Sequence, residues 1–404
     1  MSLPRHPAWI EVDLRALSHN AGVLRRAIPT DARLGLLVKA NGYGHGLEAA
    51  ARAGIAGGAE QLGVASLDEG LAVRRSGIHV PTMIVYPIPP DGVAAAVDAD
   101  LELTISGLDA AGRILDAWAA SASEGSGRPL TLHVEIDTGM GRGGVAAASL
   151  VEVLQRIDGT PDTRIAGLWS HLADGSDLGR SCRQTERFEA AVALLGATGR
   201  AVPARHLATT EAVFTRSAPA YEMVRVGLGY YGELGLGVEP LPELAGLASE
   251  LRPAMTVKAC PIRVEALPIG ATVGYGGEWR AERPSIIATL PIGYADGWTR
   301  SSWPGASALL RGRFVPLVGR ISMDSVCADV TDVATDGEVT LDEELVLLGG
   351  QGAARITPGE LARLRGTIPN EVFTGFGSRL PRIYLGEAAV AAVSSGAEAI
   401  ERNA

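Results

Sequence analysis

Short apolar runs alternate with alanine- and leucine-rich stretches through the first 240 or so residues, and this alternation constrains the fold most. The first run ends at Lys39 and precedes the helical pattern EAAARAGIAGG; later runs include QLGVAS, TMIVY, LELTIS, LTLHVEID and MVRVGLG. Repeated strand–helix units predict a parallel sheet with right-handed crossovers. Roughly eight such units favour an α/β fold, a closed (β/α)8 TIM-like barrel over residues 14–245, rather than an open sheet.

The sequence texture changes after this region. Residues 246–404 contain short strand-like runs such as SIIATLPIGY and DEELVLLGG, which turn residues separate. Helical periodicity is scarce there, so the pattern predicts a second, mostly β domain. We assign the opening strand, within residues 1–13, to this second domain as well.

Composition narrows the functional classes. The net charge of -10 disfavours nucleic acid as a partner, because phosphate binding needs a basic face. The apolar runs are shorter than the roughly 20 residues of a membrane span, and the N-terminus lacks the apolar core of a signal peptide. The three cysteines form no CxxC pair, which predicts free thiols and no metal site. We expect a cytoplasmic protein that binds neither nucleic acid nor membranes.

Lysine is nearly absent from this arginine-rich chain. Of 36 basic residues, only Lys39 and Lys258 are lysines. Lys39 ends an apolar strand within VKANGYGHG, where glycines let the backbone approach a ligand. A desolvated lysine at a barrel rim has a lowered pKa and can form an imine with an aldehyde cofactor. Lys258 lies in the middle of a predicted strand, so we expect a structural role for it.

Other polar residues follow the barrel strands, where such barrels place their sites. Asp137 and Arg142 flank a glycine turn in VEIDTGMGRGG. Arg225 lies inside the apolar run MVRVGLG, where an unpaired charge would be costly. Either a structural ion pair or a cationic partner for a ring nitrogen explains it. The glycines at 227 and 229 would then offer backbone N–H groups to a phosphate.

Three segments of the second domain carry further candidates. These are TVGYGGEWR around Tyr275, LPIGYADGWTR around Tyr294, and GRISMDSV around Met323 and Asp324. Tyr275 lies between glycines and has no obvious role in a core. Packing explains Tyr294 equally well.

These motifs, in this order, resemble the alanine racemase family. VKANGYGHG, DTGMGR, VRVGLGYYG, VGYG, IGYADG and GRISMD are spread over nearly the whole chain. The resemblance implies a fold-type III enzyme that interconverts L- and D-alanine. It further implies an N-terminal barrel holding pyridoxal 5'-phosphate, a C-terminal β domain, and a head-to-tail homodimer with shared active sites.

The resemblance also implies roles for individual residues. Lys39 resembles the Schiff-base lysine and the base on one face of the substrate, and Tyr275 resembles the acid/base that the other subunit places on the opposite face. His171 resembles the residue paired with that tyrosine. Arg225 resembles the residue at the pyridine nitrogen, where it would keep the ring unprotonated. The implied cofactor-binding residues are Lys39, Tyr43, His171, Thr209, Thr210, Arg225, Gly227 and Leu228. The implied substrate-binding residues are Arg142, Tyr294, Met323 and Asp324.

Several positions depart from the family pattern. Glu135 stands where the family commonly has a carbamylated lysine, and we hypothesise that this carboxylate holds Arg142 without modification. Thr209 and Thr210 stand where asparagine and serine are common. Asn370 replaces an entrance tyrosine, so we expect side chains larger than alanine's to be tolerated.

Three alternatives stay open. A racemase of the same family could act on serine or a larger amino acid, which the departures motivate. A non-racemising homologue that binds pyridoxal phosphate is the second, but it would not need both Lys39 and Tyr275. A decarboxylase of the same fold type is the third, although VGYG and IGYADG fit the racemase better.

Overall fold

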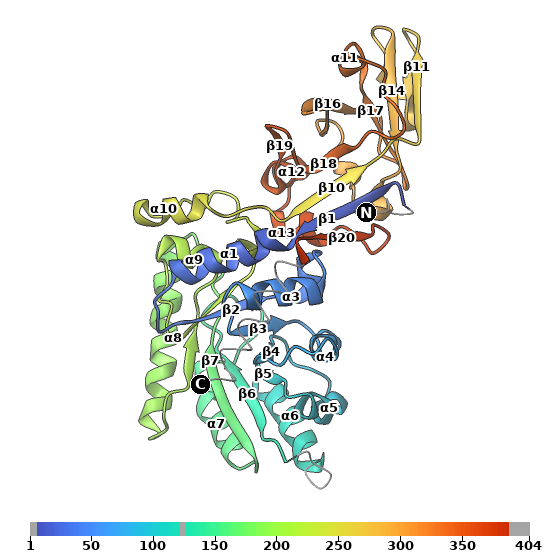
Figure 1. Cartoon of the computed structure of the whole chain (residues 1–404). Coiled ribbons are helices and arrows are strands. Elements are labelled where there is room, and N and C mark those ends of the chain that lie inside the picture. The colour runs from blue at the N-terminus through green and yellow to red at the C-terminus, as the bar shows by residue number, and fades with distance from the viewer. Residues whose placement is uncertain (1–5, 122–126, 388–404) are drawn as a thin grey trace. The chain divides into compact units, whose positions relative to one another are not determined.

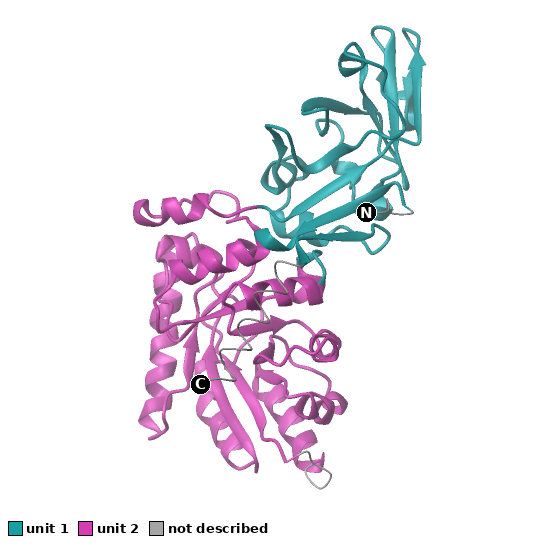
Figure 2. Ribbon diagram, viewed as in Figure 1, with its two compact units in different colours: residues 1–16, 43–46, 253–389 teal, residues 17–42, 47–252, 390–404 magenta. Residues whose placement is uncertain are grey.

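The computed structural model describes residues 6–121 and 127–387 (Figure 1). The chain divides into two compact units (Figure 2). Among the described residues, unit 1 contains 6–16, 43–46 and 253–387, and unit 2 contains 17–42, 47–121 and 127–252. The ends of the second predicted domain, residues 1–5 and 388–404, lie outside the described residues. Within the described ranges, no helix is long and apolar enough to cross a membrane.

Unit 2 is built on a closed barrel of parallel strands, which confirms the predicted α/β barrel. Each strand pairs with the next, and the last strand returns to the first with Gly35 opposite Arg225. The strands are β2 (Arg33–Leu37), β3 (Gln61–Val64), β4 (Thr82–Ile84), β5 (Glu102–Ile105), β6 (Leu130–Glu135), β7 (Thr163–Trp169), β8 (Ala204–His206) and β9 (Met223–Val226). Their carboxyl ends therefore meet at one rim.

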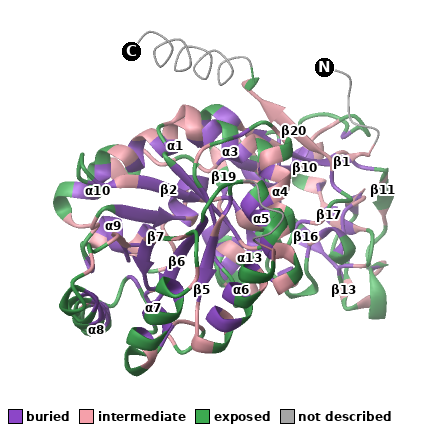
Figure 3. Cartoon of the chain, turned by 90° about the horizontal axis from the view of Figure 1, so that it is seen from below, coloured by how far each residue is buried: buried purple, intermediate pink, exposed green. Residues whose placement is uncertain are grey.

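Helices follow the strands and cover the outside of the barrel. They are α1 (Leu14–Ala27), α3 (Leu47–Ala56), α4 (Leu67–Arg75), α5 (Val93–Asp98), α6 (Leu108–Ser121), α7 (Leu150–Asp158), α8 (Leu178–Ala197), α9 (Thr210–Thr215) and α10 (Pro242–Ser249), with 3-10 turns at Pro90–Gly92, Ala147–Ser149 and Leu228–Tyr231. Helix α7 illustrates why these segments form helices that pack on the barrel. Its apolar residues recur at helical spacing and are all buried, namely Leu150, Val153, Leu154 and Ile157. Figure 3 shows the same division, with buried strands inside and exposed outer helix faces.

The segment α2 (Lys39–Tyr43) is a left-handed turn rather than an ordinary helix. Ala40, Asn41 and Tyr43 have φ of 52°, 54° and 49°, a region that non-glycine residues rarely occupy. Asn41 anchors the turn: its backbone N–H donates to Oε1 of Glu69 (3.2 Å), and its side-chain oxygen accepts from the N–H of Leu47 (2.9 Å). The turn therefore stores strain directly after Lys39, which lies two residues beyond the end of β2.

Unit 1 is mostly β, as the sequence predicts for the second domain. Its largest sheet has the order β11-β14-β17-β16-β15-β18-β10-β1-β20, with β19 beside β18 and a separate β12-β13 pair. These strands are β1 (Ala8–Asp13), β10 (Met255–Ala259), β11 (Arg263–Leu267), β12 (Thr272–Val273), β13 (Trp279–Arg280), β14 (Ser285–Leu290), β15 (Ser307–Leu310), β16 (Arg313–Val318), β17 (Val326–Asp329), β18 (Leu345–Gln351), β19 (Ala354–Ile356) and β20 (Arg382–Leu385). Short helices complete it: α11 (Thr331–Ala334), α12 (Pro358–Arg365), α13 (Pro369–Thr374) and 3-10 turns at Tyr275–Gly277, Tyr294–Asp296 and Arg300–Ser302.

The two lysines have different surroundings. Lys258 of β10 forms ion pairs with Glu11 of β1 (3.0 Å) and Glu344 (2.8 Å), so it stabilises the sheet of unit 1. This agrees with the structural role expected for it. Lys39 lies at the rim of the barrel instead.

Candidate functional site

Basic side chains converge at the carboxyl rim of the barrel in unit 2. They come from the ends of different strands and from the loops after them, and they are Lys39, Arg142, His171 and Arg225. Their charges act on one another, since Arg142 and Arg225 lower the pKa values of both Lys39 and His171. One buried carboxylate, Glu135, lies among them. An excess of positive charge at a barrel rim suits an anionic ligand.

Lys39 is half-buried and directly precedes the left-handed turn. Burial lowers the pKa of its amine, Arg142 and Arg225 lower it further, and Glu69 opposes them. A lowered pKa raises the share of neutral amine, which is the form that attacks a carbonyl carbon. The ring of Tyr86 lies 5.6 Å from Lys39 Nζ and 5.6 Å from the Arg142 guanidinium.

Arg225 is buried in β9, and its guanidinium is held from several sides. Nη1 donates to the carbonyl of His206 (2.7 Å) and lies 3.0 Å from its Nδ1, while Nη2 donates to the carbonyl of Ser170 (2.6 Å). The group also lies over the ring of Trp169. Burial lowers the pKa of Arg225 to about 9, against the effect of Glu135, so the group stays charged at neutral pH. In the described residues Arg225 has no salt bridge, so hydrogen bonds replace the structural ion pair considered above.

His171 is held as a neutral imidazole. Burial lowers its pKa to about 3, and Arg225, Arg142 and Lys39 contribute in that order. Its Nδ1 lies 3.5 Å from Nη2 of Arg225, which can only donate. The ring proton is therefore on Nε2, which can donate to an oxygen of a ligand or partner.

Glu135 ends β6 and is buried. Burial raises the pKa of its carboxyl to about 7, although Arg142 and Arg225 favour the ionised form. Oε2 lies against Gly143, where an added Cβ would stand only 3.1 Å from it. Between Glu135 and Arg142 the described structure has no hydrogen bond or ion pair, so the two interact through charge alone. That Glu135 holds Arg142 stays a prediction.

A cluster of backbone donors lies beside these groups, after β8 and β9. Thr210 is buried, and its hydroxyl oxygen accepts from the N–H of Gly229 (3.0 Å). The N–H groups of Gly227 and Leu228 have no hydrogen-bond partner among the residues described here. Thr209 donates its hydroxyl to Oε2 of Glu211 (2.6 Å). Uncommitted backbone N–H groups beside a threonine are suited to a phosphate.

The remaining predicted residues lie in unit 1, and the structure describes them only within that unit. They are Tyr43, Tyr275, Tyr294, Met323, Asp324 and Asn370. Tyr294 and Met323 come together, because the N–H of Tyr294 donates to Ser322 (3.1 Å) and that of Ala295 to Met323 (3.0 Å). Asp324 forms an ion pair with Arg379 (2.9 Å).

Tyr275 has an exposed side chain in a constrained turn. Its flanking residues Gly274 and Gly276 have φ of 77° and 76°, and a Cβ on Gly274 would lie 2.8 Å from the backbone nitrogen of Arg320. The tyrosine is 68% exposed, so it packs in no core. Asn370, in α13, is half-buried.

The sequence analysis did not identify Tyr86, which lies beside Lys39, or His133 and Glu102, which are linked to Arg225 by hydrogen bonds through His206. Tyr86 lies two residues after β4 in TMIVY, so the strand-end argument could have included it. His133 is a polar residue inside the apolar run LTLHVEID, which was the available signal. Glu102 begins β5, and nothing near it in sequence points to its role.

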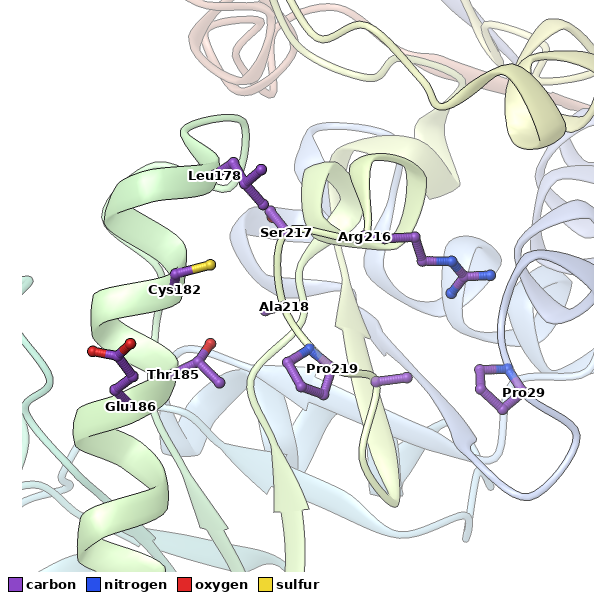
Figure 4. A pocket seen from close by; sticks show the side chains of 10 residues that line it. Pro29, Leu178, Cys182, Thr185, Glu186, Arg216, Ser217, Ala218 and Pro219 are labelled. Carbon is purple, nitrogen blue, oxygen red and sulfur yellow. The ribbon is translucent and has the colours of Figure 1, made fainter.

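A groove on the outside of unit 2 lacks the cluster of basic groups that lies at the barrel rim (Figure 4). Helix α8 contributes Leu178, Cys182, Thr185 and Glu186, and further residues are Pro29, Arg216, Ser217, Ala218, Pro219 and Ala220. One carboxylate and one guanidinium, on opposite walls, do not make an acid–base constellation. The rim of the barrel is therefore the candidate site.

Comparison with known proteins agrees with this choice. Residues 12–234 match the alanine racemase N-terminal domain and residues 254–384 the alanine racemase C-terminal domain. Alanine racemase of Symbiobacterium thermophilum is 37% identical over 391 residues, which cover 95% of this chain and 98% of that protein.

Solved structures show the same likeness. Alanine racemase of Bacillus anthracis, solved with bound L-Ala-P, superposes with a TM-score of 0.86 at 29% identity and covers 96% of this chain and 97% of that one. A histidine racemase of Leuconostoc mesenteroides superposes with a TM-score of 0.82 at 26% identity and covers 95% of this chain and 99% of that one. With both domains matched and a relative of this identity aligned over nearly its full length, the chain belongs to the alanine racemase family.

Proposed function

We propose that this protein racemises alanine with pyridoxal 5'-phosphate bound to Lys39, and that it works as a homodimer. The convergence at the barrel rim of Lys39, whose amine pKa is lowered by burial, with three further basic groups carries this proposal. The names of its relatives, alanine racemases over nearly the whole length, supply the substrate.

The residues at the rim fit the chemistry of this cofactor. Lys39 offers the amine for the aldehyde, and the backbone of Gly227 and Leu228 with Thr210 offers donors for the phosphate. Nε of Arg225 has no protein acceptor among the described residues, so it is the donor left for a ring nitrogen. When bound, the cofactor would supply the electron-withdrawing ring that weakens the Cα–H bond of an attached amino acid.

The chain's own groups would move the proton. Lys39 would take it from one face of Cα, and Tyr275 of the partner subunit would return one to the opposite face. Nε2–H of the neutral His171 would donate to the Tyr275 oxygen and so stabilise its ionised form. Arg142 would bind negative charge near the same centre.

Exposed apolar side chains of unit 1 would be available for contact with a second copy of the chain in a homodimer. Several large apolar side chains there are more than half exposed, namely Ile262, Ile269, Tyr275, Phe314 and Met323. A second copy of this chain would bring Tyr275 and Met323 to the site on its neighbour's barrel.

A racemase for a larger side chain is the second candidate. Asn370 is smaller than the tyrosine implied at this position by the family resemblance, and a histidine racemase is among the structural neighbours. Both observations favour a wider entrance than alanine needs. A panel of L-amino acids, assayed for the D enantiomer, separates the two candidates.

The proposed function is tested on the purified protein with pyridoxal phosphate. Borohydride reduction should attach the cofactor to Lys39, as peptide mass analysis would show, and L-alanine should lose optical activity while exchanging its Cα proton in D2O. Lys39→Arg should abolish both results, whereas Lys258→Arg, which keeps the ion pairs of β10, should change neither. Cofactor attached elsewhere, or exchange that survives in Lys39→Arg, would refute the proposal.

A further inference from the structure

A continuous row of hydrogen bonds crosses the interior of the barrel beneath Arg225. Nη1 of Arg225 lies 3.0 Å from Nδ1 of His206, and Nε2 of His206 lies 3.0 Å from Nδ1 of His133. Nε2 of His133 lies 2.8 Å from Oε2 of Glu102. The row joins β9, β8, β6 and β5, and the side chain of Glu102 at its end is 14% exposed.

Only one arrangement of protons satisfies this row. Arg225 can only donate, so Nδ1 of His206 accepts and its proton is on Nε2. That proton faces Nδ1 of His133, which therefore accepts and carries its own proton on Nε2, facing the Glu102 carboxylate. Reversing any link would set two N–H groups against each other. Both histidines are thus neutral and oriented from one end by a guanidinium and from the other by a carboxylate.

The charges agree with this arrangement. Burial lowers the pKa of His206 far below its usual value, and Arg225 acts in the same direction, so the ring stays neutral. Burial alone would raise the pKa of Glu102, but the hydrogen bond from His133 and the charges of Arg164 and Arg33 lower it and favour the ionised carboxyl. The amide of Gln61 also donates to Glu102 Oε2 (2.6 Å), and Arg33 donates to Gln61 (3.3 Å).

Gly167 of β7 leaves the space that the row needs. Strand β7 lies between β6 and β8, so the two histidines meet over its backbone. A Cβ added to Gly167 would lie 2.2 Å from Nδ1 of His133 and 2.6 Å from Nε2 of His206, the two atoms that share the central hydrogen bond. The backbone there is not left-handed, so close approach alone requires glycine at this position.

We propose that Glu102, His133 and His206 are positioning residues of the active site, which hold Arg225 so that its Nε–H points to the cofactor's ring nitrogen. His206 and Ser170 occupy the two terminal nitrogens of the guanidinium and leave Nε. The ionised Glu102 polarises the row and makes Nδ1 of His206 a stronger acceptor. The inference rests on the proposed function, because it assigns a purpose to Arg225.

The test uses holoenzyme reconstituted with pyridoxal phosphate labelled with 15N at the ring nitrogen. The variants are His206→Leu, which removes the row, and Gly167→Ala, which separates its two histidines. We expect the ring-nitrogen resonance to be displaced from its wild-type position in both, because the hydrogen bond from Nε–H is lost. We expect kcat to fall about 10- to 100-fold, with KM changed by less than about 3-fold, because orientation and not binding is lost.

Two further variants separate positioning from stability. Glu102→Gln keeps an acceptor for His133 but loses the charge. The ring-nitrogen resonance should therefore move less in Glu102→Gln than in Glu102→Leu. Thr104→Val removes another buried hydrogen bond from β5, that of Thr104 to the carbonyl of Ile84 (2.7 Å), and should lower thermal stability without moving the resonance.

Three outcomes decide the matter. Displaced resonances in His206→Leu and Gly167→Ala, with Thr104→Val unchanged, support the proposal. A wild-type resonance in both folded variants overturns it while leaving the proposed function intact. A wild-type protein that binds no labelled cofactor on Lys39 overturns the proposed function, and the role of the row with it.

Discussion

Ionisation of the buried Glu135 should destabilise the folded protein, so Glu135→Gln should stabilise it at alkaline pH. Glu135 is 6% exposed as a whole residue, and burial raises the pKa of its carboxyl from 4.5 to about 7. Ionising it in the folded chain is therefore harder by about 3 kcal/mol than in the unfolded chain. A raised folded-state pKa means that the folded chain holds the proton more tightly. Stability is therefore lost as the pH rises from about 4.5 through about 7.

The assay is urea unfolding at about pH 5 and about pH 8.5, on protein dialysed against hydroxylamine so that bound carbonyl compounds do not contribute. The stability of Glu135→Gln relative to wild type should rise by about 2.5 kcal/mol between these pH values. Any fixed penalty for burying an amide cancels in this comparison. Glu152→Gln, on the exposed face of α7, is the matched control and should show no such rise.

The racemase activity of Glu135→Gln should fall, although the variant is more stable than wild type at alkaline pH. If the ionised Glu135 holds Arg142, Glu135→Gln should weaken substrate use while it stabilises the fold, since a neutral amide is a poorer acceptor for a guanidinium. An unfolding difference that is the same at both pH values would refute the reasoning about burial. Unchanged cofactor binding and unchanged turnover would refute the role for Arg142.

Three further results are expected. Tyr86→Leu removes the ring beside Lys39 and should lower the pH midpoint for imine formation by about half a unit, because a cation–π contact favours the charged amine. Tyr86→Phe keeps a ring and should leave the midpoint unchanged. An unchanged midpoint in Tyr86→Leu would exclude the contact. His171→Phe removes the donor for Tyr275 and should slow Cα deuterium incorporation about 100-fold; a wild-type rate would contradict that pairing. Asn370→Tyr should reduce turnover of long side chains while sparing alanine, and an unaltered substrate range would show that this position does not limit the entrance.

Local patterns were sufficient to predict much of the barrel and its rim. Alternating strand and helix patterns predict parallel strands whose carboxyl ends meet at one rim. The sequence alone therefore predicts that Lys39, Arg142, His171 and Arg225 lie together at that rim. The burial of Arg225 follows from the apolar run MVRVGLG around it. The scarcity of lysine then singled out one amine.

Features that depend on contacts between distant segments could not be predicted. Glycines in VKANGYGHG suggest a turn, but its left-handed form at Ala40 and Asn41 depends on Glu69 of α4. Likewise, His133 and His206 are 73 residues apart, and they meet only because the barrel places β6 and β8 on either side of Gly167. The position of β1 between β10 and β20 also joins the two ends of the described chain.

Mixing two inactive variants tests most directly whether one subunit's Lys39 works with the other subunit's Tyr275. Lys39→Arg and Tyr275→Phe should each lack racemase activity, but subunits exchanged between them should form hybrid dimers with one intact site. At random exchange, about a quarter of the wild-type activity should return, since half of the dimers are hybrids and each has one of two sites. A mixture that exchanges subunits and stays inactive would contradict the shared site.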